Sequence, residues 1–232
     1  MISFLDPQLY AFPNPMKSDP TGILAIEGDL DTQRLLLAYS LGIFPWYTEG
    51  ENPILWHFPH KRMVLPLVEF HSSRRFKQLM KKHPFQIRYN TAFSEVIHHC
   101  ASVPREGQQG TWLNPSMIKS YIDLHHQGYA HSVEAWFEDR LVGGVYGITL
   151  GGMFFAESMF TLMSSSSKVA LATLVDKLKE YGYTWMDCQA YTENTARFGA
   201  FELAHTLFQP ILNETLKIKP TFVWPSEELK TE

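Results

Sequence analysis

The chain has 232 residues, 45% of them hydrophobic and 14% aromatic, so it can bury the core of one large domain or of a small and a larger one. Its 20 Lys and Arg against 24 Asp and Glu give a net charge of −4, which argues against a uniformly basic nucleic-acid-binding domain. With two cysteines, no secretory leader and no apolar run near the roughly 18 to 20 residues that span a bilayer, we expect a cytoplasmic protein without a membrane segment.

The first sixty residues are rich in Pro, Gly and aromatic residues and contain one predicted helix. Asp31 or Thr32 is its expected N-cap, and Gly42 is its expected stop. Because Pro and Gly interrupt regular structure, the remaining part is predicted to form turns and short strands. We therefore predict a small irregular N-terminal domain over residues 1–64 and a larger domain over residues 65–232.

A second helix is predicted to begin at Ser72 or Ser73 and to end before Pro84. Its apolar and cationic residues fall on opposite faces at roughly 100° per residue. A charged helix face is usually just solvated, but five cations in nine residues without an acidic one also suit a phosphate backbone. The cations are Arg74, Arg75, Lys77, Lys81 and Lys82.

From His131 onward the pattern changes to strands. Residues 131–137 and 141–149 flank a three-residue turn and are predicted to form a hairpin. A strand over 153–157, a helix over 168–181, a strand over 185–189 and a helix from about Asn194 follow. This order predicts an α+β fold.

Two polar positions at strand ends are candidate site residues. Asp187 and Gln189 end a buried strand two residues apart, which is expected to place both on one face of the strand, although Asp187 alone is also compatible with a simple turn cap. Glu157 follows four apolar residues, and a carboxylate is costly to bury without a partner. It therefore either reaches a cleft, where it meets a substrate amine, or forms an internal salt bridge.

The large aromatic residues in loop-like surroundings permit two interpretations. Tyr39, Trp46, Trp56 and Trp112 fill the core of a small domain or stack on unpaired bases. The usual metal, phosphate-loop, dinucleotide and serine-hydrolase motifs are absent, so we expect neither a metal nor a nucleotide cofactor. Cys188 is expected to be a buried, unreactive thiol.

Many of these residues also form a family pattern. The chain resembles the bacterial leucyl/phenylalanyl-tRNA–protein transferases, and the combination of Gly-Ile-Phe-Pro-Trp with Glu-Ser-Met-Phe is highly specific. The resembling segments lie in order along most of the chain and include Ala11–Pro13, Gly22–Ala25, Gly28–Leu30, Ala38–Tyr39, Gly42–Trp46, Pro53–Trp56, Gly110–Trp112, Gly128–Ser132, Leu141–Gly147, Glu157–Phe160, Ser167–Lys168 and Asp187–Gln189.

The resemblance implies a fold and a reaction. The larger domain would be GNAT-like, that is, similar to the N-acetyltransferase superfamily, with the small domain in front of it. The enzyme would act as a monomer without a cofactor. It would move Leu or Phe, and as a further donor Met, from aminoacyl-tRNA to an N-terminal Arg or Lys of a protein, which marks that protein for degradation.

The resemblance also implies roles for particular residues. Asp187 and Gln189 would be the catalytic pair, with Asp187 orienting Gln189 or holding the acceptor amine. Gln189 would contact the attacking nitrogen or the oxyanion, and Glu157 would bind the aminoacyl end, through its α-amino group. The remaining aminoacyl-tRNA-binding positions would be Trp46, Trp112, Tyr39, Val145, Phe154, Leu171, Leu174 and Met186, and the tRNA backbone contacts would be Arg74, Lys77, Lys81 and Lys82.

The chain departs from the family pattern in two places. After Trp56 the family commonly has Trp-Ser-Pro-Asp-Pro-Arg, whereas this chain has a different loop over residues 57–62 that keeps Arg62. Val145 is smaller than the methionine associated with its position. Two rival functions remain: an acetyl-CoA-dependent acetyltransferase, for which Ser164–Ser167 supplies no Gly-rich pyrophosphate loop, and a tRNA-binding module without activity, which leaves Asp187 and Gln189 unexplained.

Overall fold

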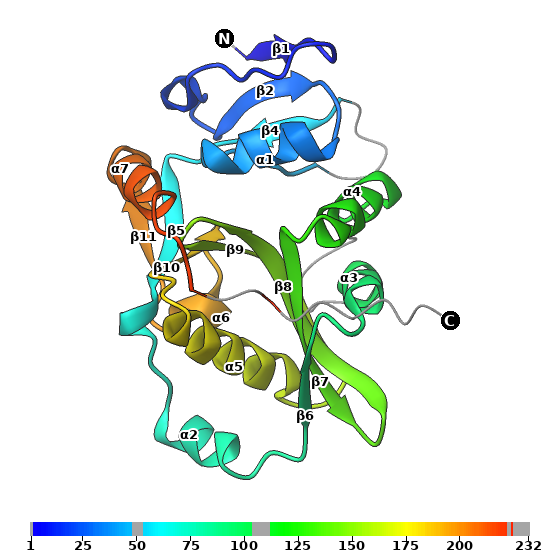
Figure 1. Ribbon diagram of the computed structural model, residues 1–232. Helices are drawn as coiled ribbons and strands as arrows, with labels where there is room; N and C mark the ends of the chain where they lie inside the picture. The colour runs from blue at the N-terminus through cyan, green and yellow to red at the C-terminus, as the bar shows by residue number, and fades with distance from the viewer. Residues whose placement is uncertain (1, 48–52, 104–111, 222–223, 225–232) are drawn as a thin grey trace.

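The computed structural model describes residues 2–47, 53–103, 112–221 and 224. Gly110 and Thr111, which belong to the family pattern, lie outside the described residues. The described part contains two sheets, a small one near the N-terminus and a large one that holds most of the chain (Figure 1).

The small sheet has four strands in the order β1-β2-β4-β3. It is accompanied by helix α1, Thr32–Ser40, whose N-cap Asp31 accepts a hydrogen bond from the Arg34 N–H as predicted. Gly42 follows the helix at φ 77°, and an added Cβ there would lie 2.8 Å from the Phe208 ring, so only glycine fits this turn. The strands are β1 Ser3–Leu5, β2 Ile23–Glu27, β3 Phe44–Pro45 and β4 Leu55–His57.

The large sheet has seven strands in the order β11-β5-β10-β9-β8-β7-β6. All neighbours are antiparallel except β9 and β10, which are parallel and are joined by helix α5. The predicted hairpin is confirmed as β7 and β8. The strands are β5 Lys61–Pro66, β6 Gln86–Tyr89, β7 Ala130–Phe137, β8 Arg140–Leu150, β9 Met153–Thr161, β10 Trp185–Gln189 and β11 Phe201–Ala204.

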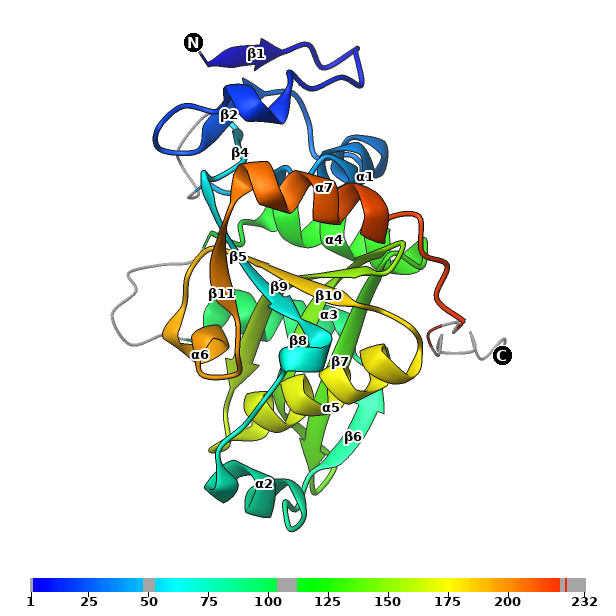
Figure 2. The same cartoon turned by 90° about the vertical axis from the view of Figure 1, so that its left-hand side faces the viewer.

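Helices cover both faces of the large sheet. Helix α5 packs on one face against β7 and β8, while α3 and α4 pack on the other (Figures 1 and 2). Gly143 of β8 makes the α5 contact possible, because a Cβ there would lie 2.1 Å from the Ser166 Oγ. The helices that follow α1 in the described residues are α2 Arg74–Met80, α3 Phe93–Ser102, α4 Pro115–His126, α5 Ser166–Glu180, α6 Glu193–Ala196 and α7 His205–Thr215. Short 3₁₀ turns lie at Pro15–Lys17 and Leu67–Glu69.

The mixed content confirms the predicted α+β class with an N-terminal unit. The predicted boundary at residue 64 stays a prediction, and that residue lies inside β5, whose partners β10 and β11 belong to the large sheet. The chain therefore changes from one sheet to the other between His57, the end of β4, and Lys61, the start of β5.

Candidate active site

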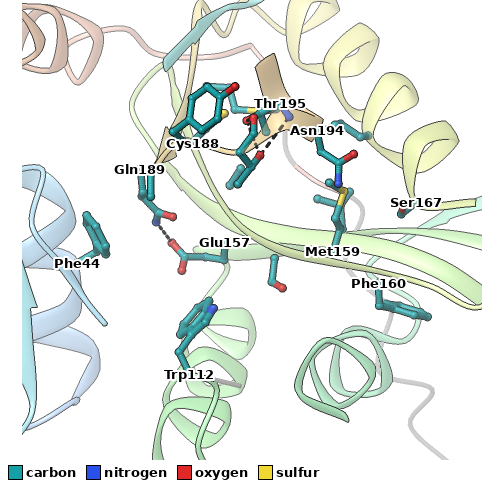
Figure 3. A pocket seen from close by; sticks show the side chains of 18 of the residues that line it. Phe44, Trp112, Glu157, Met159, Phe160, Ser167, Cys188, Gln189, Asn194 and Thr195 are labelled. Atoms are coloured by element: carbon teal, nitrogen blue, oxygen red, sulfur yellow. Dashed lines mark hydrogen bonds between the residues drawn. The ribbon is translucent and has the colours of Figure 1, made fainter. Parts of the chain in front are cut away.

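A pocket of about 720 Å³ lies between β9 and the segment that follows β10 (Figure 3). Glu157, Gln189, Phe44 and Trp112 lie toward one end of it, while Met159 and Asn194 lie toward the other. Its lining includes six consecutive residues of β9, Ala156–Thr161, and among the described lining residues Glu157 alone carries a carboxylate.

Glu157 is the centre of a hydrogen-bond cluster that draws on three separate parts of the chain. Its Oε1 accepts hydrogen bonds from the Tyr39 hydroxyl at 2.7 Å and from Gln189 Nε2 at 2.6 Å. Its Oε2 accepts one from the Tyr121 hydroxyl at 3.1 Å. The two hydroxyls are themselves 2.6 Å apart. Glu157 is thus both at the cleft and partnered, but by neutral groups and not by a salt bridge.

Burial raises the pKa of Glu157 to about 7, because the ionised form loses its contact with water. The hydrogen bonds from Tyr39, Gln189 and Tyr121 act in the opposite direction, and the nearby charge of Asp187 raises the pKa further. Burial next to Glu157 also raises the pKa of both tyrosines, so they remain neutral donors. The carboxyl can therefore exchange a proton near neutral pH.

Asp187 does not face the pocket. It is fully buried and forms a bidentate ion pair with Arg62, at 2.8 Å to Nε and 2.5 Å to Nη2. The Arg62 guanidinium also lies over the rings of Phe44 and Phe208, each at 4.7 Å. Asp187 therefore reaches the pocket only through its neighbours.

The expectation that Asp187 and Gln189 share one face of the strand is wrong. The pairing of β10 with β5 shifts register between them, and Gln189 has a φ of 58°, so the regular alternation of side chains is broken. The Asp187 Oδ1 accepts the Gln189 N–H at 2.9 Å, which stabilises this bend. The bend directs the Gln189 side chain into the pocket, where its amide meets Glu157.

An apolar wall borders this cluster. Val145 of β8, Leu171 of α5 and Met186 of β10 all line the pocket, as the resemblance implies. Phe154 and Leu174, implied for the same wall, are buried in the adjoining core cluster and do not line the pocket. They support the wall from behind. Cys188 lines the pocket but is buried, and burial raises the pKa of its thiol, as expected of an unreactive cysteine.

Two of the four aromatic candidates line the pocket. Trp46 is 45% exposed and Trp112 half-buried. Tyr39 lies behind Glu157, and Trp56 is fully buried with its indole N–H donating to the Glu27 carbonyl. Base stacking is therefore open to Trp46 and Trp112, whereas Trp56 is a core residue.

The cations of α2 lie away from the pocket, at the lower end of the molecule in Figure 1. All five side chains are exposed, and within the described ranges none forms an ion pair. The helix still borders the site region, because its Phe76 ring packs against Phe198, just beyond α6, at 5.6 Å. Thr192, Asn194 and Thr195 of the α6 region line the pocket.

Sequence reasoning missed two residues of the cluster. Tyr121 had no signal beyond its place in a helix that was not predicted. Arg62 was noted only as the residue that the departing loop shares with the family pattern, although an arginine inside an apolar strand is a signal for a buried acidic partner. Among the described residues no group of three or more His, Cys, Asp or Glu is placed to hold a metal ion, and no helix is long and apolar enough to cross a membrane.

Comparison with known proteins gives a consistent result. Residues 64–213 match the model of the leucyl/phenylalanyl-tRNA protein transferase family, and residues 28–60 match that of its N-terminal domain. A protein of this name from Myxococcus xanthus is 46% identical over 95% of this chain and 93% of its own, and one from Nitratidesulfovibrio vulgaris is 49% identical over 89% and 88%. Among solved structures, FemX aligns with 78% of this chain and 71% of its own at 12% identity and a TM-score of 0.48.

Proposed function

This chain belongs to the leucyl/phenylalanyl-tRNA–protein transferase family and is an aminoacyltransferase, and we propose that it moves Leu or Phe from aminoacyl-tRNA to an N-terminal Arg or Lys of acceptor proteins. Met is a further donor. The transfer marks the acceptor for degradation. The enzyme acts in the cytoplasm as a monomer, and its larger domain is GNAT-like.

One observation carries the proposal: an apolar wall directly adjoins a polar pair in the same pocket. Val145, Leu171 and Met186 suit a Leu or Phe side chain, and Glu157 with Gln189 suits the amine and the ester beside it. An apolar wall discriminates by only about 1 to 3 kcal/mol per methylene. It therefore accepts side chains as different as Leu and Phe.

The protein has mainly to position the acceptor amine and assist one proton transfer, because the aminoacyl ester is already activated. The acceptor nitrogen attacks the ester carbonyl and the bond to the ribose oxygen breaks, while one proton passes from the nitrogen to the ribose oxygen, which leaves as the hydroxyl of the tRNA. The Gln189 amide is a poor base, so its role is to contact the attacking nitrogen or the oxyanion. Asp187 is a positioning residue for Gln189, since its own oxygens are occupied by Arg62 and by the Gln189 N–H.

Glu157 binds the α-amino group of the aminoacyl end. Among the described lining residues it alone carries a carboxylate, and from the described part of the chain its Oε2 accepts one hydrogen bond, from the Tyr121 hydroxyl at 3.1 Å. Tyr39 and Tyr121 fix the carboxylate in place. The rings of Trp46 and Trp112 pack against the terminal adenosine, because both line the pocket and neither is fully buried.

Helix α2 contacts the tRNA backbone. Its exposed cations have no acidic partners among the described residues, which leaves their charge available to phosphates. Replacing Lys77, Lys81 and Lys82 with Gln should weaken charged-tRNA binding and reduce the slope of log affinity against log salt by roughly 0.7 to 0.9 per lost contact. An unchanged slope would make this helix an ordinary solvated surface.

The reaction is tested by offering radiolabelled Leu-tRNA or Phe-tRNA with two peptides, one beginning with Arg and one with Asp. Label on the Arg peptide alone would support donor, acceptor and reaction together. Retention of tRNA without product would favour a binding module, and binding of coenzyme A would favour the rival acetyltransferase. As a matched control, Glu193→Gln removes an exposed carboxylate near the pocket and should transfer label normally.

A further inference from the structure

The edge of β9 that faces the pocket carries backbone groups without a strand partner. On the other edge, β9 pairs with β8, and the Leu162 N–H donates to the Val142 carbonyl at 2.8 Å. In an antiparallel ladder hydrogen-bonded and non-hydrogen-bonded pairs alternate. Met159, opposite Val145, and Thr161, opposite Gly143, are therefore non-hydrogen-bonded, and their N–H and C=O groups point away from β8.

Within the part of the chain that the structure describes, no strand continues on that side. β10 pairs with β9 only from Trp185 to Asp187, opposite Met153–Phe155, and β10 ends at Gln189. Beyond this point the pocket takes the place of the missing strand. The β8–β9 register shifts at Glu157, but from Ser158 to Thr161 it is regular and side chains alternate between faces. Because all four of these residues line the pocket, the pocket runs along the strand edge and not over one face.

The opposite wall of this gap is polar but uncharged. Tyr191, Thr192, Asn194 and Thr195 line it, and the described lining residues of the whole pocket include no Lys, Arg or His. A phosphate chain would be expected to gather cations there. N–H and C=O groups that no described strand pairs with, at strand spacing, instead match an extended polypeptide, which offers the complementary groups at the same spacing.

We propose that the N-terminal segment of the acceptor polypeptide binds in this gap as a short strand parallel to β9. This inference rests on the proposed function. The acceptor amine lies at Glu157 and Gln189, and the chain leaves the pocket past Met159 and Thr161, toward the end where Figure 3 shows Asn194. From Glu157 to Thr161 the edge is about 13 Å long, at about 3.3 Å per residue, and accommodates the first four or so residues of the acceptor.

Pairing of this kind reads the backbone and not the sequence. It explains how one enzyme can accept many proteins that share only their first residue, because main-chain hydrogen bonds supply affinity whatever the following side chains are. The aminoacyl end enters from the other end of the pocket, which Trp112 lines. The two substrates then meet at the Glu157–Gln189 pair.

The test uses acceptor peptides of six residues that begin with Arg and carry one N-methyl group at position 2, 3, 4 or 5. Only every second residue of a paired strand donates its N–H to its neighbour. We expect kcat/KM to fall at least fivefold at alternate positions within the first four, and less than twofold at the intervening positions and at position 5. The intervening positions are the matched controls for the methyl group itself.

A protein variant examines the same edge from the other side. Thr161→Pro removes the N–H that faces the gap and should raise KM for the peptide severalfold with unchanged charged-tRNA affinity. Thr161→Val is its control, since it loses the hydroxyl that contacts Ser167 but keeps the N–H. Circular dichroism checks that each variant folds. If Thr161→Pro does not fold, the N-methylated peptides alone decide whether the acceptor pairs with β9.

The inference would be overturned if N-methylation lowered kcat/KM equally at every position, or at none. The β9 edge would then be assigned to binding of the aminoacyl end. Both results are distinct from a failure of the proposed function, in which even the unmodified Arg peptide receives no label.

Discussion

Replacing Glu157 with Gln should stabilise the protein at alkaline pH. The pKa of this carboxyl rises from 4.5 to about 7 on folding, so between these values the folded chain holds a proton that the unfolded chain has released. The free energy of unfolding of the wild type therefore falls as pH rises through this range. Since a tenfold change in an ionisation constant is worth about 1.4 kcal/mol, the loss amounts to roughly 3 kcal/mol.

The variant has no proton to release, so this loss should disappear. A glutamine has nearly the shape of the protonated acid, and its amide can exchange hydrogen bonds with Tyr39, Tyr121 and a flipped Gln189 amide. Urea unfolding followed by tryptophan fluorescence, at intervals from pH 4.5 to pH 8.5, gives the difference between variant and wild type. We expect that difference to grow in favour of the variant by about 3 kcal/mol across the range.

An exposed carboxyl provides the comparison. Glu193→Gln removes a carboxylate that pairs with Arg197 at the surface and serves as the matched control for the loss of one carboxyl group. The reasoning about Glu157 would be refuted if its own difference curve varied by no more than about 0.5 kcal/mol, the size of an ordinary surface substitution.

Three further substitutions have expected outcomes. Asp187→Asn leaves the Arg62 guanidinium buried without its counter-charge, so the free energy of unfolding, measured with urea, should fall by about 3 to 5 kcal/mol and transfer should slow. An unchanged free energy of unfolding would show that water reaches the arginine. Val145→Met places a larger side chain in the apolar wall and so reduces the space for the donor side chain. In parallel transfer assays, the kcat/KM for Phe-tRNA divided by that for Leu-tRNA should fall about tenfold. An unchanged ratio would place the donor side chain elsewhere. Gly143→Ala forces β8 and Ser166 apart and should destabilise the folded protein by about 2 kcal/mol, which calorimetry would show as a Tm several degrees lower. An unaltered Tm would mean that α5 can shift away from β8 at little cost.

The elements that the sequence predicted are those with local signals. Helices α1 and α2 begin after Asp31 and Ser73, whose side chains accept N–H bonds of the first turn. By contrast, α3 follows Ala92, which offers no capping side chain, and β11 is a four-residue strand that forms by pairing with β5 about 140 residues earlier. Predicting β11 requires a partner that the local pattern does not indicate.

In the site, too, the residues with a local sequence signal were predicted and those that depend on distant parts of the chain were not. Glu157 and Gln189 were identifiable as polar residues at strand ends, where clefts commonly lie. The contacts that hold them were not, although Tyr39 itself was a candidate, because Tyr39 lies 118 residues before Glu157 and Arg62 lies 125 residues before Asp187. The register shift that separates Gln189 from Asp187 likewise depends on β5, so the alternation rule gave the wrong face.

The cluster around Glu157 also has a consequence for synthesis. Its carboxylate is held by Tyr39 of α1 and Tyr121 of α4, and the Arg62–Asp187 pair behind it is covered by Phe208 of α7. A chain that has emerged from the ribosome only as far as residue 180 therefore has every tyrosine of the cluster in place but neither Gln189 nor the partner of Arg62. With the roles proposed above for Gln189 and Asp187, we expect transfer activity to appear only after the chain has been made beyond residue 189.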